Sequence, residues 1–358
     1  MFAIREPAST SPDLASPQRR RLLKATAGLA LGGVLFGTGW LVLKRGQNLF
    51  EVRRERTLMQ TSVAVTCLAS DLDAARAAIE TAFTRMAATA AILTRFDPTS
   101  ALSQLNRDGQ LAQPPAELRE VLRHALALSS RTEGAFDISV LPVLRYLEAL
   151  RKPVAPTRRE REDMADRDHL IGYRGIALDT HGVRLLRPGM AITLDGIAKG
   201  YVVDQGIAAL RAEGIEYALI DAGGDIQSIC GADPQRHWNV GIVDPHNIGE
   251  VAAVVQLRNA ALSTSGNYRV FYSADRRLFH IINPHTGYSP QGYASVTVMA
   301  DRSVLSDGLS TAAFSMDLPQ LEPTLATQGQ QWLVFAREGG QRWRSRELPL
   351  IRGRAQIV

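Results

Sequence analysis

The chain has 358 residues, which is enough for one large domain or two modest ones, and it is 45% hydrophobic and 22% charged. These proportions are those of a globular protein and exclude a disordered or fibrous chain. The net charge of +5 arises at the start, because residues 1–56 hold ten Lys/Arg and four Asp/Glu. Beyond them, 31 basic residues face 32 acidic ones, so the charge of the body gives no support for a nucleic-acid partner.

The first 50 residues have the pattern of an export signal. Arg19 and Arg20 precede an uncharged run, rich in glycine and alanine, from Ala25 to Leu43. The arginine pair resembles a twin-arginine signal, which directs the export of folded proteins. The run of 19 residues is also long enough for a membrane anchor, and no A-x-A cleavage site follows it. Both alternatives predict that the body, residues 51–358, faces the periplasm.

The chain contains two cysteines, Cys67 and Cys230. Since no cysteine precedes Cys67, a lipid-modified leader is excluded. In an oxidising compartment the two thiols could pair, if the fold brought them close enough. Two separate buried thiols is the favoured interpretation.

The first part of the body predicts a strand followed by helices. The alternating, β-branched segment 61–69 is typical of a strand. Ser70 or Asp71 then caps an alanine-rich helix that ends near Leu93. A second helix is predicted from about Pro115 to Ser130.

The second part of the body is richer in strands. Residues 151–168 are charged and contain prolines, which favours a solvated connection or a surface helix. Segment 192–214 predicts a strand, a glycine turn and a helix, and 269–273 is one of several short predicted strands. A last helix is predicted over 304–316. Short strands joined by tight turns, with a few long helices, indicate an α+β fold rather than a doubly wound sheet.

Two glycine-bearing turns contain residue types that bind phosphates and metals. In "DGIAKG", residues 195–200, backbone N–H groups and Lys199 could hold a phosphate, although the segment is neither a Walker loop nor a dinucleotide fingerprint. In "SDGLST", Asp307 and Thr311 share one helix face, where a carboxylate and a hydroxyl could bind Mg²⁺. The alternative is that Ser306 or Asp307 only caps the helix.

Two other kinds of site have little support. The seven histidines show no paired spacing typical of zinc ligands. No G-x-S-x-G elbow occurs, which argues against a serine hydrolase of the α/β type.

Eight ordered motifs together resemble the ApbE family, the FAD:protein FMN transferases. The resemblance extends over about residues 55–330. The motifs are "FDPTSALSQLN" (96–106), "GAFDISVLP" (134–142), "DGIAKGYVVD" (195–204), "DAGGDI" (221–226), "WNVGIVDP" (238–245), "LSTSGNY" (262–268), "HIINPHTGY" (280–288) and "SDGLSTAAF" (306–314).

The resemblance implies a T-fold-like α+β body with mostly antiparallel sheets and flanking helices. It implies Mg²⁺-dependent cleavage of the pyrophosphate of FAD, transfer of FMN to a threonine hydroxyl of an acceptor protein, and release of AMP. By motif, His280 matches the catalytic histidine, and Asp307, Thr311 and the carbonyl of Gly196 match metal ligands. The residues at flavin-nucleotide positions are Met59, Phe96, Ala135, Phe136, Asp137, Thr193, Lys199 and Ile281.

The chain departs from the family pattern at four places. The family's M-G-T reads Met59-Gln60-Thr61, and D-L-G-G reads Thr193-Leu194-Asp195-Gly196. P-R-T-G contains His285 in place of the arginine, and Phe96 stands where the family has a tyrosine, which keeps a stacking ring but lacks the hydroxyl. These changes affect nucleotide contacts more than the reaction.

Two other functions remain open at this point. Water could replace the acceptor, which would make the protein an FAD pyrophosphatase. If the change at Thr193 and Asp195 has disabled the metal site, the protein would be a non-catalytic periplasmic flavin-binding assembly factor. The export signal resembles the branch of the family associated with nitrous-oxide respiration, whose acceptor is a membrane-bound flavoprotein facing the periplasm.

Overall fold

A computed structural model of the chain describes residues 2–3, 40–45, 49–150, 157–273, 275–353 and 355–357. Within these ranges the main sheet has ten strands, in the order β17-β15-β14-β13-β12-β9-β8-β4-β3-β2. The strands are β2 (Trp40–Lys44), β3 (Phe50–Leu58), β4 (Thr61–Ala69), β8 (Tyr217–Ala222), β9 (Asp225–Cys230), β12 (Ala261–Gly266), β13 (Tyr293–Ala300), β14 (Gln331–Ala336), β15 (Arg342–Arg344) and β17 (Gln356–Ile357). Neighbours are antiparallel except for β15 and β17.

Two smaller sheets complete the strand content of the described ranges. One has the order β1-β10-β11-β16 and the other β5-β7-β6. Their strands are β1 (Phe2–Ala3), β10 (Trp238–Val243), β11 (Val251–Leu257), β16 (Leu350–Arg352), β5 (Gln110–Leu111), β6 (Ile176–Asp179) and β7 (Gly182–Leu185). The α+β class with mostly antiparallel sheets, predicted from the sequence, is confirmed.

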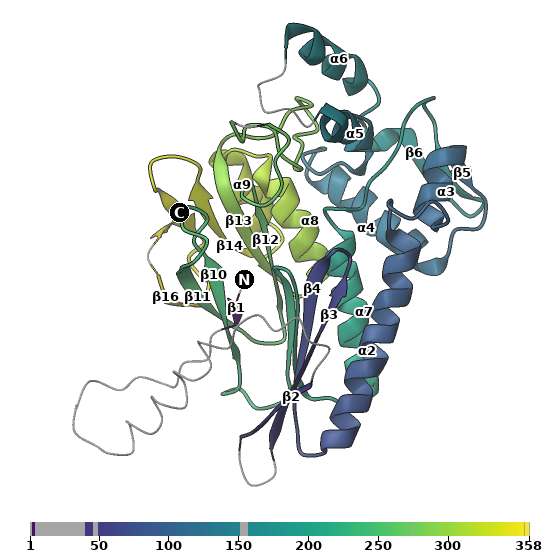
Figure 1. The fold of residues 1–358 in the computed structure, drawn as a ribbon. Helices are drawn as coiled ribbons and strands as arrows, with labels where there is room; N and C mark the ends of the chain where they lie inside the picture. Colours follow the sequence, from purple (N-terminus) through teal and green to yellow (C-terminus); the bar gives the residue numbers. More distant parts are fainter. Residues whose placement is uncertain are drawn as a thin grey trace.

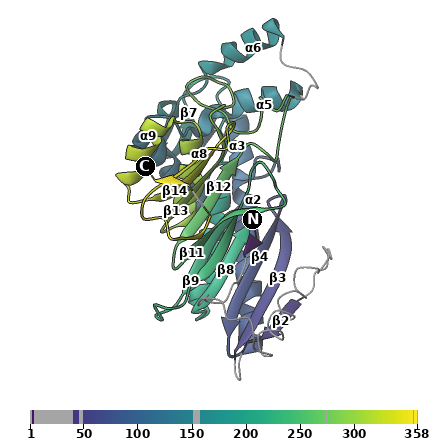
Figure 2. The same cartoon turned by 90° about the vertical axis from the view of Figure 1, so that its left-hand side faces the viewer.

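Helices cover one face of the main sheet. The helices of the described ranges are α2 (Leu72–Leu93), α3 (Ala101–Asp108), α4 (Ala116–Arg131), α5 (Leu141–Leu150), α6 (Arg158–Asp168), α7 (Ala198–Ala212), α8 (Ser303–Phe314) and α9 (Leu318–Ala326), with 3-10 turns η1 (Ile138–Val140) and η2 (Tyr173–Gly175). Helix α2 packs on β3 and β4, α7 on β8 and β9, and α8 on β12 and β13 (Figure 1). In Figure 2 the strands lie toward the viewer, with α2 behind them.

The apolar side chains form two main cores. The larger lies between the main sheet and the helices and includes Ile79 and Met86 of α2 and Val202 of α7. The second joins the main sheet to the four-stranded sheet and includes Val255 of β11 and Leu333 of β14. The main sheet therefore buries both faces, one under helices and one under strands.

The first predicted elements match the structure closely. Strand β4 occupies the predicted range 61–69, and α2 begins after Asp71, whose carboxylate accepts hydrogen bonds from the N–H groups of Asp73 (2.9 Å) and Ala74 (3.0 Å). An acceptor at this position satisfies two of the N–H groups that a helix start leaves free. Helices α4 and α8 also lie within three residues of their predicted ends.

Two predicted strands are wrong. Residues 192–194 are not in a strand, because the side chain of Asn106 accepts from the N–H of Ile192 (2.7 Å) and donates to its carbonyl (2.8 Å). Residues 269–273 form no strand either, and Phe271 makes only an isolated bridge to Phe279. In both segments tertiary contacts replace the ladder that the pattern favours.

The end of the predicted leader belongs to the main sheet. Trp40–Lys44, the last residues of the uncharged run and the lysine after it, form β2 and pair antiparallel with β3. Arg19, Arg20 and residues 25–39 lie outside the described ranges. No helix within those ranges is both long enough and apolar enough to cross a membrane.

The two cysteines do not pair. Cys67 in β4 and Cys230 in β9 are free and buried, as the favoured interpretation predicted. Burial raises the pKa of the Cys67 thiol to about 12, because an apolar environment disfavours the thiolate. This thiol is therefore a structural rather than a reactive one.

Candidate active site

A pocket of about 860 Å³ opens where one end of the main sheet meets α5, α7 and α8. The β3–β4 turn, the β8–β9 turn and the end of β12 form its sheet side. All twelve residues singled out by the sequence line it: Met59, Phe96, Ala135, Phe136, Asp137, Thr193, Gly196, Lys199, His280, Ile281, Asp307 and Thr311. The structure thus brings together residues that are spread over some 250 positions of the chain.

The β3–β4 turn presents a strained backbone to the pocket. Leu58 and Thr61 pair, so Met59 and Gln60 are the two central residues of the turn, with φ of 51° and 59°. Such turns require left-handed backbone at both positions, where glycine or asparagine is usual. Gln60 stands where the resemblance has glycine, so this chain accepts strain at the pocket wall.

Helices α7 and α8 cap each other beside the pocket. The carboxylate of Asp204 in α7 accepts from the N–H groups of Ser303 (2.8 Å) and Val304 (3.3 Å) at the start of α8. In return, Asp307 of α8 accepts from the N–H of Gly200 in α7 (2.9 Å). The interpretation of Ser306 or Asp307 as a cap of its own helix is therefore wrong, since that helix begins at Ser303 and is capped from α7.

Only glycine fits at position 200. A Cβ there would lie 2.2 Å from the carbonyl oxygen of Ser303 and 2.8 Å from the Cβ of Asp307. Gly200, the second glycine of "DGIAKG", thus permits the close approach of the two helices rather than a contact with a phosphate. This approach sets the Asp307 carboxylate at the start of α7.

Three oxygen donors converge at the α7–α8 contact. The Thr311 hydroxyl lies 3.4 Å from the carbonyl oxygen of Gly196 and 3.3 Å from the Ser265 hydroxyl, and Asp307 lies one helical turn before Thr311. Carboxylate, hydroxyl and carbonyl oxygens are ligands that Mg²⁺ prefers. Within the described ranges no cluster of three or more His, Cys, Asp or Glu offers another metal site.

The charge around Asp307 also fits a cation. Burial, and then the nearby Asp225, raise the pKa of Asp307 to about 7, although Lys199 opposes the shift. The raised pKa means that the positive charge of Lys199 does not fully balance the negative charge of Asp307 and Asp225. A bound divalent cation would supply the additional positive charge. The residues present therefore fit the metal that the resemblance implies.

Lys199 lines the pocket and is held by two buried acidic residues. Its ammonium contacts the carboxylate of Asp225 and lies 3.9 Å from Asp307. Burial alone would lower the pKa of Lys199, but Asp225 and Asp307 outweigh it and raise the pKa above the ordinary value. The lysine therefore stays protonated and places a fixed positive charge in the pocket.

His280 lines the pocket and carries a buried ring nitrogen, Nδ1, without a hydrogen-bond partner among the described residues. Burial is the main reason that the pKa of His280 is lowered, and the positive charges of Lys199 and Arg269 act in the same direction, against a hydrogen bond to the Val270 backbone and the charge of Asp195. The imidazole is therefore neutral at pH 7 and can accept a proton.

The backbone at His280 is fixed by packing. The preceding residue, Phe279, is fully buried, makes an edge-to-face contact with Phe314 (5.9 Å between ring centroids), and exchanges two hydrogen bonds with the Ser289 hydroxyl. His285, by contrast, is exposed and does not line the pocket. His285 therefore makes no contribution to the pocket wall.

The carboxylate of Asp137 serves the fold. It accepts from the N–H of Ser139 (2.8 Å), the hydroxyl of Ser139 (2.6 Å) and the N–H of Tyr173 (2.6 Å). Its side chain is thereby occupied in capping η1 and holding η2. Any contribution of this residue to a ligand is therefore expected from the backbone of 135–137.

Sequence reasoning left Asp195 unassigned and missed Arg95 and Glu148. The N–H of Asp195 donates to the Thr193 hydroxyl (3.1 Å), and the Asp195 carboxylate accepts from Arg95 (2.7 Å). Arg95 also pairs with Glu148 of α5. The partners lie 100 and 53 residues from Arg95, so no local pattern could have indicated them.

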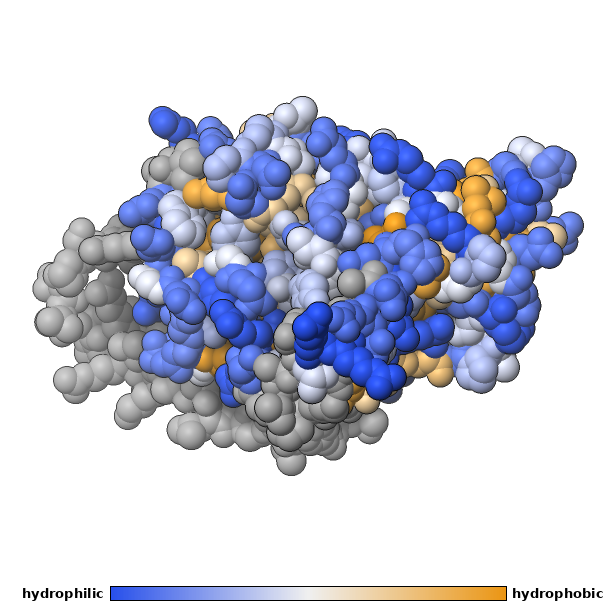
Figure 3. All heavy atoms as spheres, turned by 90° about the horizontal axis from the view of Figure 1, so that it is seen from above, coloured by the Kyte–Doolittle hydropathy of each residue, from blue (hydrophilic) through white to orange (hydrophobic). Residues whose placement is uncertain are grey.

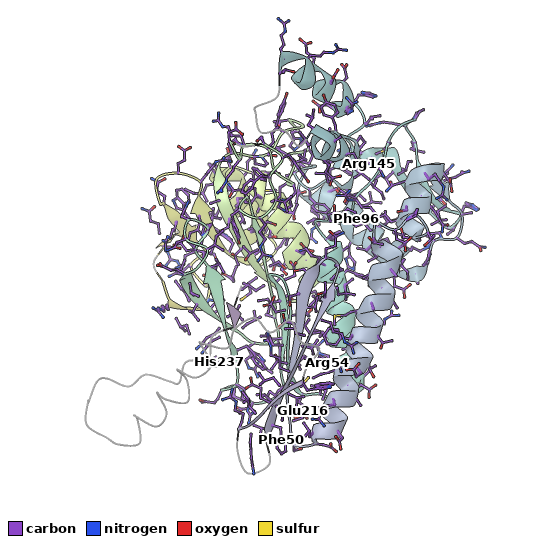
Figure 4. All side chains as sticks on the ribbon, viewed as in Figure 1. Phe50, Arg54, Phe96, Arg145, Glu216 and His237 are labelled. Carbon is purple, nitrogen blue, oxygen red and sulfur yellow. The ribbon has the colours of Figure 1, made fainter. Side chains whose placement is uncertain are left out.

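The mouth of the pocket is partly apolar. Of the six large hydrophobic side chains that are exposed within the described ranges, Phe96 (58% exposed) and Val270 (42%) line the pocket. Figure 4 shows Phe96 near the upper end of α2, below α5 with its Arg145, and far from Phe50 and Glu216 at the other end of the molecule. Seen from above, the surface is mostly hydrophilic, with small separate hydrophobic areas (Figure 3).

Comparisons with known proteins agree with this architecture. A model of the ApbE family matches residues 59–334. The FAD:protein FMN transferase of Haemophilus influenzae is 33% identical over 236 residues, covering 62% of this chain and 67% of that protein, and the one from Treponema pallidum is 31% identical over 256 residues, covering 66% and 71%.

Solved structures show the same fold. The ApbE protein of Thermotoga maritima superposes with a TM-score of 0.72 at 25% identity, covering 86% of this chain and 97% of that one. The flavin transferase ApbE of Vibrio cholerae superposes with a TM-score of 0.70 at 22% identity, covering 83% and 98%.

Proposed function

Because the chain belongs to the ApbE family, whose model spans residues 59–334, we propose that it is an FAD:protein FMN transferase. The reaction is Mg²⁺-dependent transfer of FMN from FAD to a threonine hydroxyl of an acceptor protein, with release of AMP. One observation carries the proposal: His280, whose Nδ1 has no hydrogen-bond partner among the described residues, lines the same pocket as Asp307, Thr311 and Gly196.

The residues of the pocket divide the chemical work. His280 takes the proton of the threonine hydroxyl, the threonine oxygen forms a bond to the phosphorus of the FMN half, and the P–O bond to the AMP half breaks. Lys199 offers positive charge to the phosphates, and the apolar wall around Ile281 excludes water. A cation held by Asp307, Thr311 and the Gly196 carbonyl supplies charge neutralisation for the pyrophosphate when bound.

The other two functions are distinguished by products. The purified protein is incubated with FAD, Mg²⁺ and a candidate acceptor domain, and the acceptor is then weighed by mass spectrometry. An acceptor that gains FMN less one water supports transfer. AMP with free FMN indicates the pyrophosphatase, and intact bound FAD indicates the binding protein.

The role of His280 has its own test. His280→Ala is expected to reduce labelling of the acceptor by at least about a hundredfold, the lower end of the range for loss of a general base, while FAD still binds. Full transfer by this variant would exclude His280 as the base.

The leader supports a proposal about location. Arg19, Arg20 and the uncharged run that follows favour export by the twin-arginine route, with or without retention at the inner membrane, and hence a periplasm-facing acceptor flavoprotein that carries the target threonine. Replacing both arginines by lysine is expected to keep the protein in the cytoplasm. Unchanged recovery in the periplasmic fraction would argue against this route.

A further inference from the structure

Arg95 is a buried cation that joins three separate elements at the pocket mouth. It follows the end of α2, and its side chain is 8% exposed. Its Nε donates to Asp195 in the turn before α7 (2.7 Å), and its two terminal nitrogens donate to the two carboxylate oxygens of Glu148 in α5 (2.5 and 3.2 Å). Because guanidinium is planar and this contact is two-pronged, the position and tilt of the group are both fixed.

The fixed guanidinium covers one face of an exposed ring. Its central carbon lies 4.2 Å from the centroid of Phe96, within range of a cation–π contact. Phe96 lines the pocket and is 58% exposed, so few other contacts restrain the ring. The contact with Arg95 is therefore one that can restrain this ring.

The same guanidinium also reaches the turn that carries a proposed metal ligand. Asp195 precedes Gly196, whose carbonyl accepts from Thr311. The carboxylate of Asp195 stands at a position where the family pattern has glycine, so the link from Arg95 to this turn is a feature of this chain's own residues. Arg95 therefore contacts both the exposed Phe96 ring and the turn that leads to Gly196.

We propose that Arg95 is a positioning residue of the transferase, which holds the Phe96 ring in place for the flavin ring of the nucleotide. Asp195 and Glu148 orient the guanidinium, and the guanidinium orients the ring. This inference rests on the proposed function, because it assigns the ring a flavin nucleotide as its partner. A purely structural ion pair would stabilise the fold without acting through Phe96.

A double-mutant cycle separates these two possibilities. The dissociation constant of FAD is measured by fluorescence, without acceptor and without turnover, for Arg95→Lys, Phe96→Ala and the double variant. Lysine keeps the charge but lacks the planar fork. We expect each single variant to weaken FAD binding by about three- to tenfold, the size of one aromatic contact.

The double variant decides the outcome. If Arg95 acts through Phe96, the double variant binds FAD no more weakly than Phe96→Ala alone, because the arginine then has no ring to hold. Effects that multiply, or an Arg95→Lys variant with unchanged FAD affinity, would overturn the proposal. Because the readout is binding, failure of FMN transfer would refute the proposed function and leave the cycle interpretable.

Two further variants control for the fold. Arg85→Lys alters an arginine of α2, the helix that Arg95 follows. Arg85 pairs with Gln205 (2.8 Å) and Glu117 (3.2 Å) away from the pocket, so FAD affinity should stay unchanged. Asp195→Asn weakens one support of Arg95 at a side chain that is 43% exposed, and it is expected to weaken FAD binding about two- to threefold. If Arg95→Lys fails to fold, Asp195→Asn still tests the proposal, because an unchanged FAD affinity of Asp195→Asn would contradict it.

Discussion

The two faces of the main sheet are buried by opposite means. Under α7 and α8 the protein buries Asp204, Asp225 and Asp307, and these carboxylates cap helices or contact Lys199. Between the main sheet and the four-stranded sheet the core consists of aliphatic and aromatic side chains such as Val255 and Leu333. Buried charge costs free energy unless it is paired, so the pocket end of the first face carries a cost of burial that the second core does not.

This difference indicates where function and stability can be changed separately. Removal of the polar groups that line the pocket, such as Asp307, should affect activity far more than folding. Apolar groups between the sheets should behave in the reverse way. The predictions below test this division, beginning with the change expected to have the largest effect.

Asp307→Asn should abolish Mg²⁺-dependent FMN transfer, by at least about a hundredfold, because an amide replaces the charged metal ligand. The amide oxygen can still accept from the N–H of Gly200, so the capping of α7 is retained. Transfer measured against Mg²⁺ concentration checks this expectation, and an unchanged metal dependence would contradict it.

The same variant, Asp307→Asn, should show how much the buried, charged carboxylate lowers the free energy of unfolding at neutral pH. The pKa of Asp307 is raised from 3.8 to about 7 in the fold, so its stabilising effect in the neutral form is present below about pH 4 and is lost as the pH rises toward 7. Without metal, unfolding midpoints should therefore show that Asp307→Asn loses less stability than the unmodified protein over this range. Equal losses would mean that Asp307 is not strained by burial.

Leu333→Ala tests the opposite face. Leu333 of β14 is 1% exposed in the core between the sheets, and truncation of a buried leucine usually lowers the free energy of unfolding by about 2–5 kcal/mol. Because Leu333 does not line the pocket, kcat and KM should stay within about twofold below the unfolding transition. Urea denaturation and steady-state kinetics on one preparation give both values, and a large change in KM would show that the two faces are coupled.

Whether a feature could be predicted from the sequence depends on how far apart along the chain the residues that specify it lie. Alternation over 61–69 and the cap at Asp71 are local, and both gave elements that the structure confirms. The motif order brought His280, Asp307 and Gly196 into one predicted site, although no single motif did so. Their gathering in one pocket is confirmed, whereas their roles stay predictions.

Other features depend on contacts between distant segments. The reciprocal caps of Asp204 and Asp307, and the pairing of Arg95 with Glu148, join residues that lie 53 to 107 positions apart. No periodicity or turn signal encodes such pairs. Residues 192–194 were mistaken for a strand because Asn106, far away in the chain, supplies the hydrogen bonds of Ile192.

Gln60→Gly, in the β3–β4 turn at the pocket, should raise the free energy of unfolding by a small amount. Gln60 has a φ of 59°, where glycine is free of the steric strain that a side chain suffers, so the variant is expected to be more stable by about 0.5–1 kcal/mol. Glu133→Gly is the matched control, because Glu133 has a φ of 51° but does not line the pocket. If only Gln60→Gly also changes the KM for FAD, the strain is kept for a ligand contact, and a loss of stability would contradict the strain itself.

The smallest effect concerns the charge state of His280. Because burial disfavours the imidazolium, the pKa of His280 lies below the ordinary value of 6.5, so the stability contributed by its neutral form is present above pH 6.5 and is lost as the pH falls through the folded-state pKa. NMR titration of the ring, assigned by comparison with His280→Ala, should place its midpoint below 6.5. A midpoint above 6.5 would mean that the pocket stabilises the imidazolium, and a residue already protonated at neutral pH could not serve as the base. A midpoint below 6.5 would show that the imidazole is mainly neutral at pH 7, which is the form that a general base requires.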